Sequence, residues 1–150
     1  MELKKKFRVI LYREAQDFLT GLDEKTRDKI YQTFDRASLL LDPEAFKKLA
    51  DTDIWEFRTL FNKRKYRVLA FWDKTKPVNT LVIATHGFVK KTQKTPQKEI
   101  NKAITIREIY FTELSEVIME VKGEVKGEVK GTIPHEQTAS KAIVQPVSLA

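Results

Sequence analysis

The residues best suited to chemistry lie in one basic stretch, 86–96, which places three lysines within five positions: Lys90, Lys91 and Lys94. The stretch separates an apolar run typical of a buried strand, 79–85, from a helix start at Pro96 that Thr95 can cap. Ammonium groups and the free backbone N–H groups of a helix start both attract an anion, and a phosphate suits them. The alternative is a solvated basic turn, because most short charge runs have no specific role.

Two apolar runs upstream, 54–60 and 65–72, each carry an arginine, Arg58 in the first and Arg67 in the second. A buried guanidinium without a partner costs several kcal/mol, so each arginine needs either a carboxylate or an open cleft. A guanidinium fork binds two phosphate oxygens at once, which makes both arginines candidates for phosphate binding. The alternative is that both are structural and bonded to Glu56 or another nearby carboxylate.

Alternation along the first of these strands assigns its faces. Trp55 and Phe57 share one side, whereas Glu56 and Arg58 share the other. We expect the aromatic side to pack under helices, which leaves Glu56 and Arg58 facing a groove. In the second strand both sides are largely apolar, so alternation alone does not place Arg67.

The remaining elements form a frame around these strands. Apolar spacing predicts a first strand at 7–12, helices at 14–19, 23–41 and 96–110, one further helical turn at 43–49, and a turn at 62–64. The longer N-terminal helix has an apolar stripe at helical spacing: Ile30, Phe34, Ala37 and Leu41. Lys47 and Lys48 are expected to be exposed.

Composition limits the class of protein. At 150 residues with 41% hydrophobic content, the chain supports one modest core and is too short for two ordinary domains. It has no cysteine and only two histidines, His86 and His135, so we expect no cofactor and no metal site, with a carboxylate-held magnesium as the alternative. Because there is no apolar run of about eighteen residues and no signal-peptide pattern, we expect a cytoplasmic protein without a membrane partner.

The net charge of +7 is unevenly placed. Residues 111–150 hold six Glu and four Lys, so their net charge is −2 and residues 1–110 carry +9. A basic domain of this size attracts polyanions, which favours nucleic acid as a partner. The alternative is a basic protein that is simply soluble.

After Leu114 the composition changes. The motif Glu-Val-Lys-Gly occurs three times in succession over 120–131, and small polar residues dominate the rest. Each glycine costs a helix about 1 kcal/mol, and a strand gains little from so few side chains, so we expect an extended or disordered segment. We therefore divide the chain into one domain, 1–114, and a flexible C-terminal tail, 115–150.

These segments together are similar to a known family. The strings WEFR and KYRVLAFW, then HGFVKKTQKTP and a helix with Glu99, Ala103 and Arg107, resemble the RelE/ParE superfamily of toxins from bacterial type II toxin–antitoxin systems. The HigB-like, phage-associated branch is the nearest in pattern, and the resemblance covers roughly residues 5–112. It implies an α+β, RelE-like fold: a small, twisted, antiparallel-rich sheet with an N-terminal helical hairpin on one face and a C-terminal helix.

The resemblance also implies an activity. Members of this family are ribosome-dependent messenger-RNA endonucleases (mRNA interferases) that inhibit translation. The ribose 2′-OH attacks the adjacent phosphorus, which gives a 2′,3′-cyclic phosphate and a free 5′-OH without a metal ion. The expected partners are a cognate antitoxin protein, the ribosome and messenger RNA, and no small-molecule cofactor is implied.

Each step of that reaction has candidates in this chain. Arg58 and Arg67 would bind the phosphate, and Lys90 and Lys91 would stabilise its developing charge. A lysine is also a candidate base if neighbouring positive charges depress its pKa. Glu56 or His86 are further candidates for base or acid, because a histidine titrates near neutrality; alternatively, His86 is a strand-end histidine with a satisfied hydrogen bond.

RNA contacts extend beyond the reacting groups. The expected RNA-binding residues are Lys90, Lys91, Lys94, Arg64 and Thr92. Phe88 and Trp72 are either stacking platforms for a base or core residues, and the core reading is favoured. The chain departs from better-defined members of the superfamily in having no short C-terminal strand with a catalytic tyrosine or histidine, and Tyr110 is its only late tyrosine.

Two other function classes remain open from sequence. A ParE-like gyrase inhibitor shares the fold, binds a protein target and catalyses no reaction. An inactive relic that only binds RNA is the second. The strand arginines together with the lysine-rich stretch favour the nuclease, because a protein that only binds its target has no need of cations converging on one groove.

Overall fold

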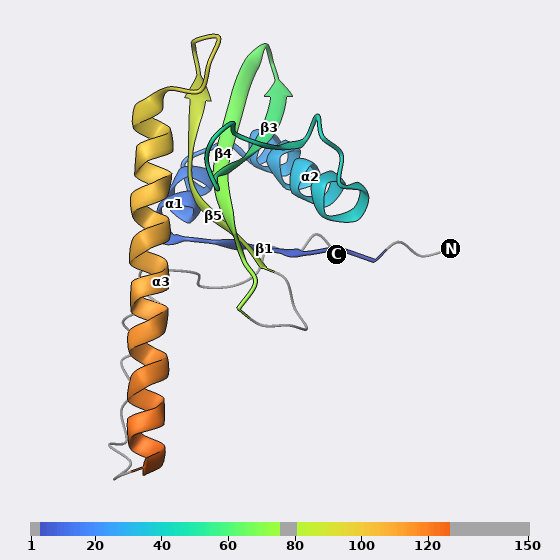
Figure 1. Cartoon of the computed structure of the whole chain (residues 1–150). Helices are drawn as coiled ribbons and strands as arrows, with labels where there is room; N and C mark the ends of the chain where they lie inside the picture. Colours follow the sequence, from blue (N-terminus) through green and yellow to red (C-terminus); the bar gives the residue numbers. More distant parts are fainter. Residues whose placement is uncertain (1–3, 76–80, 127–150) are drawn as a thin grey trace.

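The computed structural model describes residues 4–75 and 81–126. In chain order the elements are β1 (Arg8–Leu11), α1 (Arg13–Thr20), α2 (Glu24–Leu40), β2 (Phe46–Lys48), β3 (Trp55–Phe61), β4 (Arg64–Asp73), β5 (Leu81–Lys90) and α3 (Gln97–Lys126). They form one five-stranded sheet of order β1-β5-β4-β3-β2, in which β1 and β5 are parallel and the other pairs antiparallel (Figure 1). The expected α+β class with an antiparallel-rich sheet is therefore confirmed.

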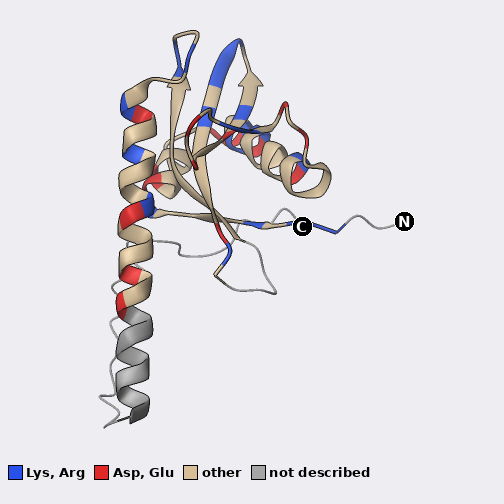
Figure 2. Ribbon diagram, viewed as in Figure 1, with Lys and Arg blue, Asp and Glu red and all other residues tan. Residues whose placement is uncertain are grey.

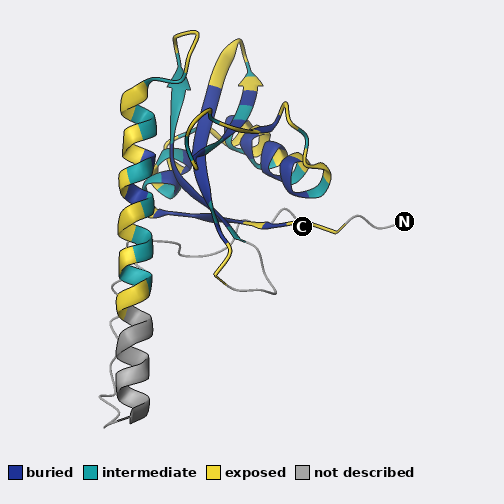
Figure 3. Ribbon diagram, in the orientation of Figure 1, coloured by how far each residue is buried: buried dark blue, intermediate teal, exposed yellow. Residues whose placement is uncertain are grey.

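Two apolar clusters cover the two faces of the sheet. On one face α1 and α2 pack through residues such as Leu19 and Phe34 against Phe57 and Val68. On the other face α3 packs through residues such as Ala103 against Leu69 and Phe71. Figure 3 shows the buried residues concentrated in the strands between these layers. The helical hairpin therefore lies on one face, as expected, and α3 covers part of the face that carries Glu56.

Helix α2 begins where its sequence predicts. Asp23 caps it by accepting hydrogen bonds from the backbone N–H and the hydroxyl of Thr26, at 3.2 Å and 2.6 Å. The apolar stripe is buried as far as Ala37, but Leu41 lies outside the helix with φ 52° and is 48% exposed. The expectation that Leu41 belongs to the core was wrong, because the left-handed residue that ends the helix turns away from the stripe.

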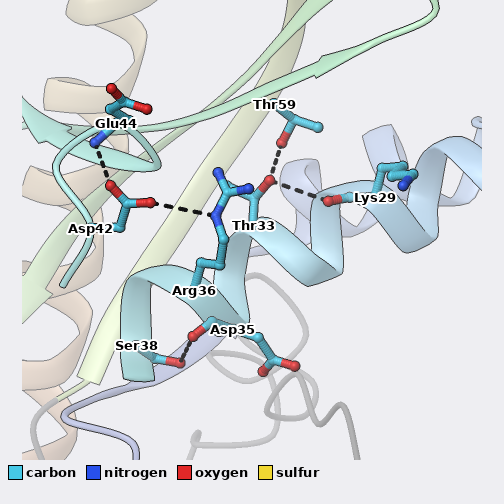
Figure 4. A network of polar contacts seen from close by, with 8 residues as sticks. All are labelled: Lys29, Thr33, Asp35, Arg36, Ser38, Asp42, Glu44 and Thr59. Carbon is cyan, nitrogen blue, oxygen red and sulfur yellow. Dashed lines mark hydrogen bonds and ion pairs between the residues drawn. The ribbon is translucent and has the colours of Figure 1, made fainter. Parts of the chain in front are cut away.

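A polar network ties the end of α2 to the sheet (Figure 4). The hydroxyls of Thr33 and Thr59 are 2.7 Å apart, so α2 and β3 share a buried hydrogen bond. Beyond the helix, Asp42 accepts from the backbone N–H of Glu44 at 2.9 Å and lies 3.6 Å from the guanidinium of Arg36. The contacts of Asp42 hold the start of the connection to β2 against the last turns of α2.

Residues 46–48 form a strand and not the helical turn expected there. They pair antiparallel with β3, and Lys48 lies opposite Trp55. The reason is aromatic packing, since the Phe46 ring stacks on Phe57 at 4.4 Å and on Trp55 at 4.7 Å. Lys47 and Lys48 are exposed, as expected.

The hairpin between β3 and β4 turns on two residues. Asn62 and Lys63 have φ angles of 51° and 63°, and positive values at both centres of a two-residue turn suit the right-handed twist of the strands. Asn tolerates this conformation well. Arg64, which the sequence placed in the turn, is the first residue of β4 and pairs with Phe61.

Strand β5 is longer than expected and includes residues 86–90 of the basic stretch. It continues to Lys90, which lies opposite Lys65, because β4 is equally long and offers a partner at every position apart from a register shift at Leu69/Ala70. Only residues 91–96 connect the strand to α3. A strand end near residue 85 was therefore wrong.

Helix α3 is also longer than expected. It runs from Gln97 to Lys126, so the predicted end at Tyr110 and the extended conformation of the first repeat were wrong. A helix that is already nucleated gains a hydrogen bond with each added residue, and one glycine, at about 1 kcal/mol, does not stop it. Residues 127–150, and with them most of the predicted tail, lie outside the described residues. No described helix is long and apolar enough to span a membrane.

Candidate functional site

Cationic side chains from three strands meet on the face of the sheet that α3 partly covers. Arg58 of β3 lies opposite Arg67 of β4. Arg67 is two residues before Leu69 and therefore shares its face of the sheet, and Leu69 packs towards α3. Glu56 shares the face of Arg58, whereas Phe57 packs under α1 and α2. The faces predicted from alternation are therefore confirmed, and Arg67 lies on the same face as Glu56 and Arg58.

Glu56 is the centre of this cluster. It is 3% exposed, and its Oε1 lies 3.5 Å from Nε of Arg67 and 3.8 Å from Nε of Arg58. Its Oε2 accepts a short hydrogen bond from the hydroxyl of Thr95. One buried carboxylate thus faces two guanidinium groups and is held from the side of the loop before α3.

The two arginines differ in access. The Arg67 side chain is 5% exposed and donates from Nη1 to the carbonyl of Tyr66 at 3.1 Å. The Arg58 side chain is 37% exposed, so its guanidinium reaches solvent while it is still paired with Glu56. Arg67 is a fixed cation inside the site, and Arg58 is a cation at its mouth.

Burial and like charge both act on these cations. The pKa of Arg67 is lowered chiefly because burial disfavours the charged form, with the charge of Arg58 acting in the same direction and Glu56 opposing it. Lys90 has a lowered pKa for the same main reason, and Arg67, Arg58 and Lys65 add repulsion that Glu56 partly offsets. Lys90 is therefore an ammonium that gives up its proton more readily than an ordinary lysine.

Two hollows open beside this cluster, and together they are called the basic groove below. One, of about 780 Å³, is lined by Lys63, Arg64, Lys65, Val89, Lys90, Lys91, Thr92 and Gln93. The other, of about 500 Å³, is lined by Arg36, Glu44, Arg58, Thr59, Leu60, Lys65 and Arg67. Lys65 belongs to both, so the hollows are adjacent. Figure 2 shows Lys and Arg gathered at the β3–β4 turn and at the loop after β5, where the groove lies.

Most of the predicted residues gather here, and two do not. Lys94 is exposed and lines neither hollow; its carbonyl accepts from the hydroxyl of Thr92 at 2.6 Å. His86 is buried, with Nε2 3.2 Å from Oε1 of Glu99 and Nδ1 3.0 Å from the Thr85 hydroxyl. For the neutral ring, the tautomer with its proton on Nε2 donates to Glu99, and Nδ1 accepts from Thr85 when that hydroxyl gives up its alternative acceptor, the Leu69 carbonyl at 3.2 Å.

The surroundings of His86 favour that neutral ring. Its pKa lies below the ordinary 6.5, first because of burial and then because of the nearby charge of Lys102, while Glu99 and Glu14 act in the opposite direction. The ring lies between β5 and α3 and lines neither hollow of the basic groove. The geometry matches the satisfied histidine that the sequence left as an alternative.

The other singled-out aromatic residues have structural contacts. Phe88 is half-buried against the cluster beneath α3, and Trp72 packs at 5.0 Å from Phe7 on the opposite face. The Tyr110 hydroxyl donates to Asp73 at 2.5 Å, and burial followed by this bond raises its pKa well above the ordinary range. Tyr110 therefore ties α3 to the end of β4.

Sequence reasoning missed two members of the site. Thr95 was expected to cap α3, but its hydroxyl is bonded to Glu56. Lys65 was treated only as the start of a strand, although its pairing with Lys90 brings it into both hollows. A longer β5 would have revealed that pairing. Among the described residues, no group of three His, Asp or Glu side chains is placed to hold a metal ion.

Comparison with known proteins relates most of the chain to a protein family. A search of curated proteins finds no match to the chain. The family model described as "Phage derived protein Gp49-like (DUF891)" matches residues 17–108. The match includes α2, all three strands of the cationic cluster and the first turns of α3. The chain belongs to the family of phage-derived Gp49-like proteins.

Proposed function

We propose that this protein is the toxin of a type II toxin–antitoxin pair and cuts messenger RNA on the ribosome. The observation that carries the proposal is the cluster of Arg58, Arg67 and Lys90 around one buried carboxylate, at the floor of a basic groove. Membership of the Gp49-like family supports it, because that family is associated with RelE-like, toxin-like proteins.

The arginines are suited to the transferring phosphate. Glu56 attracts both guanidinium groups, because its Oε1 lies within ion-pair distance of each Nε atom, although it is hydrogen-bonded to neither. Groups that are already oriented stabilise charge in a transition state without the cost of reorganisation. In this scheme Glu56 is a positioning residue, and Arg58 and Arg67 bind the non-bridging phosphate oxygens.

Lys90 is suited to proton transfer. Its lowered pKa increases the neutral fraction at a given pH, and a neutral amine accepts the proton of the attacking 2′-OH. The O2′–P bond forms, the P–O5′ bond breaks, and the leaving 5′ oxygen takes up a proton. Lys91, which lines the same groove, is the proposed donor of that proton.

The two other candidates for base fit less well. Both oxygens of Glu56 are engaged, one by the arginines and one by Thr95, so the carboxylate is committed to positioning. Both nitrogens of His86 are bonded, and its ring is 3% exposed. A side chain in that position has no open path to an RNA strand in the groove.

The proposal includes partners and a location. An active nuclease of this kind works in the cytoplasm, where ribosomes translate, and it needs an antitoxin that keeps it inactive. Besides Arg36, the groove is lined by seven Lys and Arg residues, and Glu44 is the one carboxylate among its described lining residues. We expect the antitoxin either to cover it with an acidic segment or to block entry to the ribosome.

Brief induction in a bacterial host without the antitoxin tests the function. Transcript 5′ ends are mapped for the wild type, for Arg67→Ala and for Arg13→Ala, an exposed arginine of α1 that serves as the matched control. New ends inside translated regions are expected for the wild type and the control, and none for Arg67→Ala. Loss of DNA supercoiling before any transcript is cut would instead support the gyrase inhibitor.

A further inference from the structure

A third hollow lies at the opposite end of β3 and β4 from the basic groove. It has a volume of about 500 Å³, and we call it the tryptophan pocket; it is lined by Lys48, Asp53, Trp55, Trp72, Lys74 and Arg107. Along β4, Lys65 of the groove and Trp72 of the pocket are separated by about 23 Å, at 3.3 Å per residue. The pocket shares no lining residue with the groove.

Its aromatic wall is preformed. The rings of Trp55 and Trp72 meet edge to face at 5.7 Å and 78°, and Phe46 stacks behind Trp55 at 4.7 Å. The ammonium of Lys74, an exposed residue, lies over the Trp72 ring at 5.4 Å. A flexible, exposed side chain on the ring shows that this face of the indole opens to the surface, where a flat ligand can replace the ammonium.

The charges in the pocket select the kind of ligand. Three of its six described lining residues are cations, and the only carboxylate among them is Asp53, 3.9 Å from Arg107. Lys48 and Lys74 remain for an anion. A purely apolar ligand would gain nothing from the lysines, and a purely acidic peptide would gain nothing from the indoles. A nucleotide has both a flat base and a phosphate, as single-strand binding sites require.

We propose that the tryptophan pocket binds one nucleotide of single-stranded RNA, with the base on an indole and the phosphate at Lys48 and Lys74. The inference rests on the proposed function in one respect: it adds a second grip on RNA, remote from the site of cleavage. Binding here needs neither Arg67 nor Lys90.

Tryptophan fluorescence tests this directly, because Trp55 and Trp72 are the only two tryptophans in the chain. The full-length protein is titrated with a short oligouridylate and with an abasic ribose-phosphate chain of the same length. We expect the oligouridylate to quench the emission and the abasic chain to leave it unchanged, since stacking needs a base. An unchanged emission while a labelled oligouridylate binds would overturn the inference and leave the proposed nuclease intact.

Charge variants then locate the phosphate. Lys48→Glu combined with Lys74→Glu changes two exposed side chains, and we expect the affinity measured by quenching to fall roughly tenfold or more. The matched control carries the same charge change in the groove, Lys63→Glu combined with Lys91→Glu. Its affinity measured by quenching should remain higher than that of the pocket variant. An equal loss of affinity in both variants would overturn the assignment. So would a glutamate-rich peptide that displaces the oligouridylate and quenches the tryptophan emission to the same extent. Quenching that persists in a cleavage-inactive Arg67→Ala protein would support it.

Discussion

The Nε atom of Arg67 lies 3.5 Å from Oε1 of Glu56, and both side chains are almost completely buried. Removing two charges from water is costly. A protein in which hydrophobic side chains of similar volume replace a buried ion pair is often equally stable or more stable. The pair is therefore weak evidence for stability. Its value in this fold is that it places a fixed guanidinium beside Arg58 and Lys90, at a point where the sheet opens to solvent.

Neutralising Glu56 should destabilise the protein. In Glu56→Gln the buried Arg67 loses its counter-charge, and removing one partner of a buried ion pair costs about 3–5 kcal/mol. We expect a correspondingly lower urea midpoint at an unchanged slope. Glu44→Gln, which changes an exposed carboxylate at the edge of the groove, should leave the midpoint almost unchanged. Equal midpoints for the two variants would mean that Glu56 does not balance Arg67.

Replacing Lys90 with arginine should separate binding from proton transfer. Arginine keeps the positive charge but is not deprotonated in proteins, so Lys90→Arg should bind RNA and fail to cleave it. For the wild type, the cleavage rate should rise with pH as Lys90 loses its proton, and level off at a pH below the ordinary lysine value of 10.5. Lys91→Arg is the matched variant and should keep that rise. A wild-type pH profile in Lys90→Arg would exclude Lys90 as the base.

His86 should make the fold sensitive to mild acid. Because its folded pKa lies below 6.5, the unfolded chain binds more protons between the folded value and 6.5. The free energy of unfolding should therefore fall as the pH drops through 6.5, and this contribution should stop changing below the folded pKa. Thermal unfolding between pH 7.5 and about 5.5 measures the effect. His86→Gln should flatten the dependence; an equally steep curve would place the titrating group elsewhere.

Gly87 should be intolerant of a side chain. A Cβ atom at this position would lie 2.2 Å from the ring of Phe18 in α1, so Gly87→Ala forces the ring or the helix to move. Overpacking of this kind typically costs about 1–3 kcal/mol. Gly21→Ala is the control, because its Cβ would make only ordinary contacts at 3.6 Å. Replacing the ring by the smaller side chain of leucine, in the double variant Gly87→Ala with Phe18→Leu, should recover part of the stability that Gly87→Ala loses. A double variant no more stable than Gly87→Ala would argue against this contact.

The parts of the fold that depend on local patterns were predictable. Asp23 and the apolar stripe of α2 identify that helix, and alternation at 55–58 assigns Glu56 and Arg58 to one face. Both signals are contained within a few consecutive residues, because capping and strand pairing act over short distances.

The parts of the fold that depend on partners distant in sequence were not predictable. The sequence 46–48 is a strand because Phe46 meets Phe57 and Trp55, and β5 reaches Lys90 because β4 offers Lys65 as its partner there. The bond from Thr95 to Glu56 joins residues 39 apart in sequence. Such contacts override local preference, so a single sequence does not reveal them.

The cleavage rate of Arg67→Ala tests the central claim most directly. Purified wild-type protein, Arg67→Ala and the control Arg13→Ala are compared in single-turnover cleavage of messenger RNA on programmed ribosomes. Loss of one preorganised donor to the transition state should lower the rate about 10²–10³-fold in Arg67→Ala, while the control cuts like the wild type and both leave a 2′,3′-cyclic phosphate. Cleavage by folded Arg67→Ala at the wild-type rate would contradict the assignment of this cluster as the phosphate site.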